Sequence, residues 1–480
     1  MRTKIVATLG PASMAYDTLK QMVGFGVRIF RLNFSHSNAA TFQPVVKMIR
    51  ELENELNLPL TAMGDLCGPK TRIGDIEGSP RQIDKDDLVL LGLPDQDPDN
   101  DQVFIGLNFP ELLKGLDKGM PVSLSDGMLR FSVERVLKAD QLFELRSQNG
   151  GLLTSHKGIT FPGKHHAVRA LTPKDRIDAH EGLDIGLDAL AMSFVQDRSD
   201  VDDLKAEIRK HGTWLPVVAK LERKNAVDNV ESILDAADAV MVARGDLGLE
   251  CPLTELPVIQ KRIIRAARHA QKAAIVATQM VLSMVNNPLP TRAEVTDVAN
   301  AIMDGADCVM LSEETAIGSY PLDVVSLIQG IAGSAEAYML ERIQGPYQPK
   351  KEKYPAKYLA YAACLLADNL ESPALVCHST SGNTARLLAS RRPTQPIYAL
   401  TPDSKVLHML NFYFGIHPAA PDLSIESHEL RAEAFIRNMD GFKPGDPLVI
   451  TSGQPTPGQD RELMKDKDAL ITNLIKVYYK

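Results

Sequence analysis

The sequence is poor in cysteine, has no surplus of positive charge and contains no long apolar run, and each shortage excludes a class of protein. Its five cysteines are scattered and odd in number, which disfavours a zinc framework or a disulfide scaffold and fits a reducing, cytoplasmic compartment. The net charge of −8 leaves no excess Lys and Arg to neutralise nucleic acid, so we expect no such partner. No apolar stretch approaches the ~20 residues that span a bilayer, and we expect neither membrane contact nor a secretion signal.

Eight short apolar runs, each followed by a helix-like segment, form the strongest pattern in the chain. At 480 residues the chain is too long for one core, and its length predicts about two to four domains. Eight parallel strands buried on both faces are what a closed (β/α)8 TIM barrel needs. The expected strands are Lys4–Leu9, Ile29–Leu32, Leu60–Met63, Ala189–Met192, Pro216–Ala219, Ala239–Ala243, Ala274–Ala277 and Cys308–Leu311.

Two further domains are expected beside this barrel. About a hundred residues separate the third and fourth strands, which is too long for a plain loop. Alternating, turn-rich pieces in this insertion, such as Val122–Leu124, predict a small β domain placed as a lid. An α/β pattern restarts after the eighth strand. We therefore expect an α/β fold with the barrel over 1–67 and 169–342, an inserted β lid domain over 68–168 and a C-terminal α/β regulatory domain over 343–480.

Polar or charged residues follow every one of the expected strands. In barrels of this class the carboxyl ends of the strands carry the active site. One polar strand end that meets solvent would be ordinary, but eight in register favour a functional cluster. Two neighbouring strands end in Lys220-Leu221-Glu222 and Arg244-Gly245-Asp246. Their two carboxylates suit a hard divalent cation such as Mg²⁺, and Lys220 is a point charge for a phosphoryl group in transfer. The alternative is a set of structural ion pairs at the rim.

Two other segments offer contacts for phosphate. Arg31, Asn33 and Ser35 alternate along the second strand and so share one face, where an arginine can make forked phosphate contacts. The alternative is a polar strand end. In the C-terminal part, a strand and a helix are joined by a hydroxyl- and glycine-rich loop that predicts a phosphate cradle, although such turns also serve as plain helix caps. Its residues are Ser379, Thr380, Ser381, Gly382, Asn383 and Thr384.

Several ordered segments resemble the pyruvate kinase family from one end of the barrel to the other. The most specific is Pro290–Thr315, PTRAEVTDVANAIMDGADCVMLSEET. The others are Lys4–Ser13 (KIVATLGPAS), Arg31–His36 (RLNFSH), Gly64–Arg72 (GDLCGPKTR), Lys220–Glu222 (KLE), Met241–Gly248 (MVARGDLG) and Ala277–Met280 (ATQM). The resemblance implies a glycolytic enzyme that transfers the phosphoryl group of phosphoenolpyruvate to ADP, giving pyruvate and ATP.

The resemblance also implies roles for the matching positions. Glu222 and Asp246 would hold the catalytic Mg²⁺ or Mn²⁺. Lys220 would stabilise the transferring phosphoryl group, and Arg31 would grip it from the other side. Thr278 would lie where the enolate carbon is protonated. The remaining substrate contacts would come from Ser193, Phe194, Ala243, Arg244 and Gly245, and the nucleotide contacts from His36, Arg72, Asp126 and Lys174.

Lys70 is the most informative departure from the family pattern, because many members have Glu there. Members with Glu need K⁺ beside the substrate phosphate, held by positions that match Asn33, Ser35, Asp65 and the Leu66 carbonyl. Since the ammonium group of Lys70 is itself a monovalent cation, we expect an enzyme that works without K⁺. The resemblance further implies a homotetramer and activation by a phosphorylated effector at the 379–384 loop.

Two other functions share part of this pattern. A metal-dependent pyruvate aldolase would have the barrel and the acidic metal pair, but no reason for the lid or for Arg72 and Lys174. A catalytically dead sugar-phosphate sensor would keep the C-terminal cradle and could lose Lys220 or Asp246, which are both present.

Overall fold

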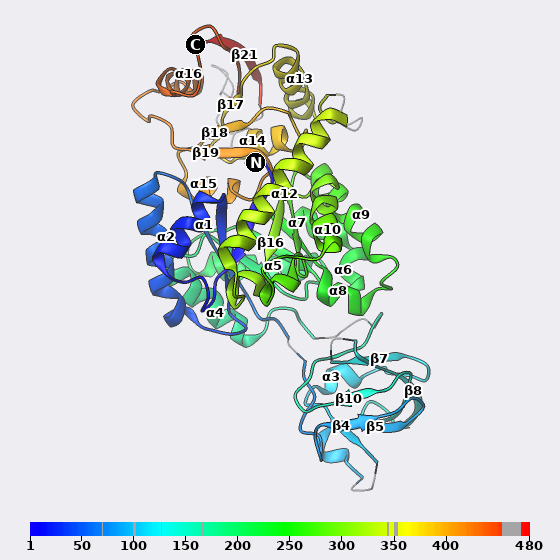
Figure 1. Ribbon diagram of the computed structural model, residues 1–480. Coiled ribbons are helices and arrows are strands. Elements are labelled where there is room, and N and C mark those ends of the chain that lie inside the picture. The colour runs from blue at the N-terminus through cyan, green and yellow to red at the C-terminus, as the bar shows by residue number, and fades with distance from the viewer. Residues whose placement is uncertain are drawn as a thin grey trace.

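The computed structural model stacks three bodies along one direction, with the barrel in the middle (Figure 1). It describes residues 1–69, 71–98, 102–125, 127–164, 168–342, 345–349, 354–453 and 472–480. Lys70 and Asp126, which the sequence places in the site, lie outside the described residues. The expected barrel, inserted β domain and C-terminal α/β domain are confirmed, while their exact boundaries stay predictions.

All eight expected strands pair in parallel into a closed barrel of order β1-β16-β15-β14-β13-β12-β3-β2. Their ends differ from the expected ones by no more than two residues. The bounds are β1 (Lys4–Thr8), β2 (Val27–Asn33), β3 (Thr61–Asp65), β12 (Ala189–Met192), β13 (Val217–Leu221), β14 (Ala239–Ala243), β15 (Ala273–Ala277) and β16 (Cys308–Leu311).

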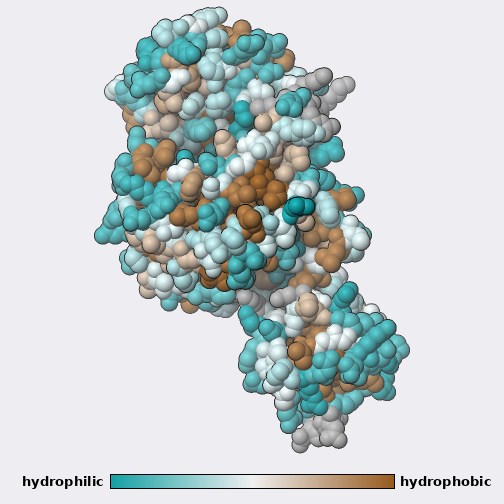
Figure 2. Space-filling view, in the orientation of Figure 1, coloured by the Kyte–Doolittle hydropathy of each residue, from teal (hydrophilic) through white to brown (hydrophobic). Residues whose placement is uncertain are grey.

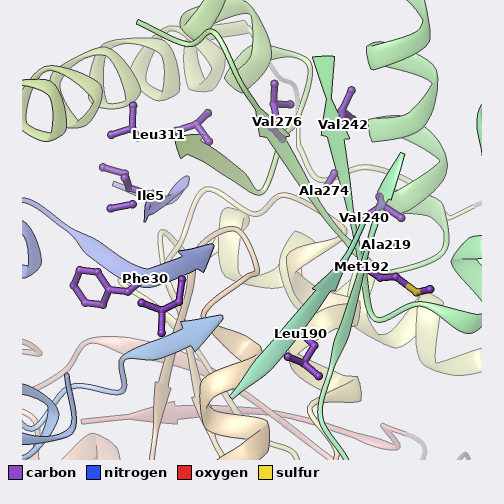
Figure 3. Close-up of a cluster of buried hydrophobic side chains, with 14 of the residues drawn as sticks. Ile5, Phe30, Leu190, Met192, Ala219, Val240, Val242, Ala274, Val276 and Leu311 are labelled. Atoms are coloured by element: carbon purple, nitrogen blue, oxygen red, sulfur yellow. The ribbon is translucent and has the colours of Figure 1, made fainter. Parts of the chain in front are cut away.

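Helices surround the barrel because alternate strand residues point outward as well as inward. On β14, Val240 and Val242 belong to the cluster between strands and helices, whereas Met241 belongs to the cluster inside the barrel. Figure 3 shows the outward set, including Ala274 and Val276 on β15. The helices of this layer are α1 (Tyr16–Gly24), α2 (Ala39–Leu56), α4 (Pro173–Asp184), α5 (Arg198–Lys210), α6 (Lys224–Asp228), α7 (Val230–Ala236), α8 (Arg244–Glu250), α9 (Leu256–His269), α10 (Arg292–Met303), α11 (Glu313–Ala316) and α12 (Pro321–Arg342).

The insertion forms a small β domain with its own core beyond the carboxyl ends of the barrel strands (Figure 1). Its larger sheet has the order β11-β7-β8-β9-β5-β6, and β10 pairs with β4 separately. The bounds are β4 (Arg81–Ile83), β5 (Leu88–Gly92), β6 (Phe104–Gly106), β7 (Pro121–Leu124), β8 (Leu129–Lys138), β9 (Leu142–Ser147), β10 (Gly151–Leu153) and β11 (Ile159–Thr160), with the short helix α3 (Pro110–Leu113).

The C-terminal domain is a five-stranded sheet of order β19-β18-β17-β20-β21, parallel except for the edge strand β21. It packs on the amino end of the barrel, where Arg392 forms a buried ion pair with Asp307 at 2.8 Å and the Cys308 thiol donates to the Phe412 carbonyl. This packing closes one end of the barrel and leaves the carboxyl ends for the site. The bounds are β17 (Leu375–His378), β18 (Ile397–Leu400), β19 (Ile416–Ala419), β20 (Pro447–Ser452), β21 (Leu474–Tyr479), α13 (Pro355–Asn369), α14 (Asn383–Ala389), α15 (Ser404–Leu410) and α16 (His428–Asn438).

Polar and apolar side chains are mixed over the face shown in Figure 2, and the most prominent of several apolar areas lies on the barrel layer. None of the helices in the described part of the chain combines the length and the apolarity that crossing a bilayer requires.

Candidate active site

A buried network of charges links four barrel strands at their carboxyl ends. The Lys220 ammonium on β13 lies 3.0 Å from Glu222 Oε1 and 3.3 Å from Asp65 Oδ1, and it donates to the Ser193 hydroxyl at 2.7 Å. Arg31 on β2 reaches the other oxygen of Asp65, with 2.6 Å between Nε and Oδ2. These groups come together because β2, β3, β12 and β13 are neighbours in the barrel. The network therefore presents two cations and two carboxylates at the barrel mouth.

The carboxylate of Glu222 has a strongly perturbed pKa in this network. Burial, together with the nearby charge of Asp246, raises the pKa of Glu222 to about 7 against the opposing effect of Lys220. The mutual repulsion of two carboxylates is what a bound divalent cation relieves. Both side chains line one cavity, and oxygen ligands are those that Mg²⁺ and Mn²⁺ prefer. The pair fits such a metal.

Lys220 is held in its charged form by its surroundings. Burial lowers the pKa of Lys220, but the carboxylates of Asp65 and Glu222 outweigh burial and raise it above the ordinary value. Asp65 in turn keeps a lowered pKa despite its burial, because Lys220 and Arg31 lie beside it. A charged ammonium group is therefore available to an anionic substrate.

The loops around the network have a strained backbone. Phe194, Thr278 and Gln279 have φ values of 57°, 68° and 53°, in the left-handed region that non-glycine residues rarely adopt. Neighbouring groups hold two of them in place: the Phe194 amide donates to Glu222 Oε2 at 2.7 Å, and Thr278 Oγ1 accepts from the Gly245 amide at 2.9 Å. Such strain concentrates at functional sites, because the surrounding structure must enforce it.

The start of α8 stands next to this strained segment. Ala243 is the N-cap residue of α8, and Asp246 follows in its first turn. The Arg244 side chain turns away to Asp297, with 2.6 Å between Nη1 and Oδ2, and it also donates to the carbonyl of Thr278 at 2.8 Å. Arg244 thus ties the ends of β14 and β15 together through its side chain, while its backbone belongs to the helix start.

A cavity of about 90 Å³ lies between the network and the inserted domain. Its barrel wall includes Phe194, Glu222 and Asp246, and its lid wall includes Ser123 and the segment 158–160. The inserted domain therefore borders the barrel mouth, and its role as a lid stays a prediction.

The residues expected on the nucleotide side are more exposed than the network. Arg72 is exposed, and its Nη1 donates to the His156 carbonyl at 2.8 Å where the lid joins the barrel. Lys174 pairs with Asp178 and donates to the Phe34 carbonyl at 3.1 Å. His36 is exposed in the turn after β2. The structure does not bring these side chains into the buried network.

The oxygens expected in the monovalent-cation pocket lie on, or within two residues after, the ends of the adjacent strands β2 and β3. Asn33 is opposite Asp65 in the register of these strands, and its Oδ1 accepts from the Ser35 amide at 3.1 Å. The Leu66 carbonyl accepts from the Ser193 hydroxyl at 2.8 Å. Asp65 is already paired with Arg31 and Lys220, so it shares its negative charge with two protein cations.

The C-terminal cradle is a tight turn between β17 and α14. Gly382 has a φ of 77°, and an added Cβ there would meet the Met409 side chain at 3.0 Å. The hydroxyls of Ser379 and Thr384 are buried in the turn itself, since Ser379 Oγ accepts from the Thr384 amide at 3.2 Å. Thr380 and Ser381 are exposed. The second pair is therefore the one accessible to a ligand.

Three residues of the site were given no role from the sequence, although Glu314 belongs to the polar residues that follow the eighth strand. The Thr8 hydroxyl accepts from Arg31 at 3.0 Å, and the fully buried Glu314 accepts from the amides of Val281 and Ser312. Arg223 lines the cavity directly after Glu222. The available signal was their position at strand ends, which is too common to single them out.

Comparisons with known proteins agree with these features. A family model described as the pyruvate kinase barrel domain matches residues 1–325, and one described as the pyruvate kinase alpha/beta domain matches residues 357–477. "Pyruvate kinase 2" of Synechocystis sp. is 38% identical over 457 residues, covering 94% of this chain and 76% of that protein. The "Pyruvate kinase" of Thermococcus litoralis is 36% identical, covering 95% of each chain. That of Agrobacterium vitis is 39% identical, covering 95% and 94%. The chain therefore belongs to the pyruvate kinase family and is a phosphotransferase.

Proposed function

We propose that this protein transfers the phosphoryl group of phosphoenolpyruvate to ADP in glycolysis, giving pyruvate and ATP. The observation that carries the proposal is the buried network in which Lys220 lies between Glu222 and Asp65, with Asp246 across the same cavity. Phosphoryl transfer needs little covalent chemistry from a protein, and positioning and charge neutralisation supply most of the rate. The network provides both.

The protein groups divide this work between them. Glu222 and Asp246 would hold Mg²⁺ or Mn²⁺, which supplies positive charge to the phosphoryl oxygens when bound. Lys220 neutralises the phosphoryl group in transfer, and Arg31, fixed by Asp65 and Thr8, orients it from the other side. The remaining substrate contacts are those of Ser193, Phe194 and the α8 start. Thr278 would lie near the place where the enolate carbon is protonated, and the lid would exclude water.

A coupled assay tests this function against its nearest alternative. Phosphoenolpyruvate, ADP and Mg²⁺ are supplied, and pyruvate is measured by its reduction with NADH and lactate dehydrogenase. We expect turnover that requires all three components. Pyruvate released instead from a 4-hydroxy-2-oxoacid without nucleotide would identify a metal-dependent aldolase.

We further propose that the enzyme works without K⁺, because Lys70 supplies the monovalent charge. Placing K⁺ beside an ammonium group would cost several kcal/mol if the two were ~4 Å apart at an effective dielectric near ~20. The pairing of Asp65 with Arg31 and Lys220 supports the proposal, since that carboxylate has little negative charge left for a further cation. Assays in tetramethylammonium salts at matched ionic strength should show a response to added K⁺ of less than about twofold.

The variant Lys70→Glu should acquire a K⁺ requirement in the same assay. Lys157→Glu makes the same charge change at an exposed lid lysine and should remain independent of K⁺. A wild type that is inert until K⁺ is added would show that Lys70 is not the built-in cation.

The 379–384 cradle is proposed to bind a phosphorylated activator, with a hexose or pentose monophosphate or a nucleoside monophosphate as candidates. Its exposed hydroxyls, on Thr380 and Ser381, are free to face a phosphate, as an anion site at the start of a helix requires. The double variant Thr380→Ala/Ser381→Ala should therefore lose activation, so that the rate with effector equals the rate without it. Ser334→Ala, an exposed serine on α12, is the matched control. Activation that survives the double change would place the effector elsewhere.

Assembly and location are part of the same proposal. We expect a homotetramer in the cytoplasm, with coupling between the effector and active sites through a shared conformational change.

A further inference from the structure

Arg223 is a buried arginine of the cavity that the mechanism above does not use. It follows Glu222 at the end of β13, and only 6% of its surface is exposed. Its Nη1 is buried and has no hydrogen-bond partner among the described residues. Buried donors without a partner are rare in folded proteins, and each one needs an explanation.

The surroundings of Arg223 fix its position but leave this donor unused. Its guanidinium lies over the Phe194 ring, 5.1 Å from the ring centroid, and the Phe194 amide is held by Glu222. Burial lowers the pKa of Arg223, while the carboxylates of Glu250, Glu222 and Asp200 act in the opposite direction. The side chain is therefore stacked in one place, with its Nη1 amino group desolvated and without a hydrogen-bond partner among the described residues.

The residues that line the cavity indicate which kind of ligand could accept a hydrogen bond from Arg223 Nη1. Arg223 shares the cavity with the carboxylates of Glu222, Asp246 and Glu250 on the barrel side. The lid side is lined by neutral residues that include Thr71, Ser123 and Thr160. Among the described residues of this lining, Arg223 is the one cation, and an oxyanion is the ligand that a guanidinium recognises best.

The position of Arg223 distinguishes between the two anionic substrates. Lys220 and Arg31, which would hold the phosphoryl group of phosphoenolpyruvate, belong to the buried network and are not among the residues that line this cavity. Arg223 comes after Glu222 in the chain and shares its cavity with the lid. We propose that Arg223 is a nucleotide-binding residue that donates Nη1–H to the diphosphate of ADP beneath the lid, an assignment that rests on the function proposed above.

The test compares Arg223→Met with wild type in direct binding and in kinetics. Methionine keeps an apolar stem against Phe194 and removes the charge. Calorimetry with Mg·ADP in the absence of phosphoenolpyruvate should show affinity reduced by about tenfold or more, as loss of a charged hydrogen bond predicts. KM for ADP should rise similarly, while KM for phosphoenolpyruvate should stay within about twofold. Arg223→Lys, which retains the charge, should recover part of the affinity.

A melting curve and a control variant distinguish nucleotide binding by Arg223 from a purely structural role. The ligand-free Arg223→Met variant should melt at the wild-type temperature or above it, because the change removes a buried charge whose Nη1 donor has no hydrogen-bond partner among the described residues. Lys224→Met, which deletes a charge paired with Asp228 on the surface, is the matched control and should leave both KM values unchanged.

Three results would overturn the assignment. They are an unchanged Mg·ADP affinity, an equal loss of phosphoenolpyruvate affinity, and a lowered melting temperature with normal nucleotide binding. If wild type binds Mg·ADP through Arg223 but forms no pyruvate, the proposed reaction fails while the binding site stands.

Discussion

Replacing Lys220 by methionine should lower kcat by about 10³-fold or more, while KM for phosphoenolpyruvate changes by less than about fivefold. The ammonium group lies 3.0 Å from Glu222 and 3.3 Å from Asp65, and its pKa is raised above the ordinary value, so its charge is present at every working pH. A charge used most strongly in the transition state affects kcat more than binding.

The same change should also lower stability, because Lys220 compensates buried carboxylates. Protonation of Glu222 should offset part of this loss of stability, because it removes a buried negative charge and the pKa of Glu222 is already about 7. Melting curves therefore accompany the kinetics, which are measured well below the transition. Lys272→Met, which removes a largely buried lysine that donates to the Ala237 carbonyl at 2.7 Å, is the control and should keep kcat within about twofold. A Lys220→Met variant that loses only substrate affinity would show that the lysine has a different role.

Replacing Asp246 by alanine should reduce turnover by about 10³-fold or more and weaken metal binding, because one of two carboxylate ligands is lost. Asp246 contributes to the raised pKa of Glu222, so its removal relieves repulsion in the metal-free protein. We therefore expect a melting temperature without metal that is equal to that of wild type or higher. Binding of Mn²⁺, followed by electron paramagnetic resonance, should fall together with activity.

A surface aspartate provides the control for this variant. Asp228→Ala removes a carboxylate that pairs with Lys224 on α6 and should change neither metal binding nor turnover. Near-normal activity of Asp246→Ala at ordinary Mg²⁺ concentrations would exclude Asp246 as a metal ligand.

The barrel could be predicted from the sequence because each buried parallel strand is a short apolar run. Three predicted strands end too early because polar residues interrupt the apolar run. Asn33, Asp65 and Lys220 lie inside β2, β3 and β13, but their polarity indicates the end of a strand. The antiparallel edge strand β21 was not predicted. Its sequence, LIKVYY, is short and only partly buried, and it carries no signal of its direction.

Candidate site residues could be proposed from the sequence, but the partners of their side chains could not. Pairing of Asp65 with both Arg31 and Lys220 depends on the order of strands around the barrel, which places β3 near β2 and β13. The left-handed backbone of Thr278 has no local signature either, because threonine rarely adopts it. The unpaired donor of Arg223 likewise follows from packing that no single segment encodes.

The most direct test of the proposed reaction follows both phosphorylated substrates in one sample. Wild-type protein is mixed with phosphoenolpyruvate, ADP and Mg²⁺, and ³¹P nuclear magnetic resonance is recorded over time. We predict that the phosphoenolpyruvate signal decays while the γ-phosphate signal of ATP grows at the same rate, and that a chelator stops both changes. Phosphoenolpyruvate that persists, or that yields inorganic phosphate without ATP, would contradict a transfer to ADP at the site of Lys220, Glu222 and Asp246.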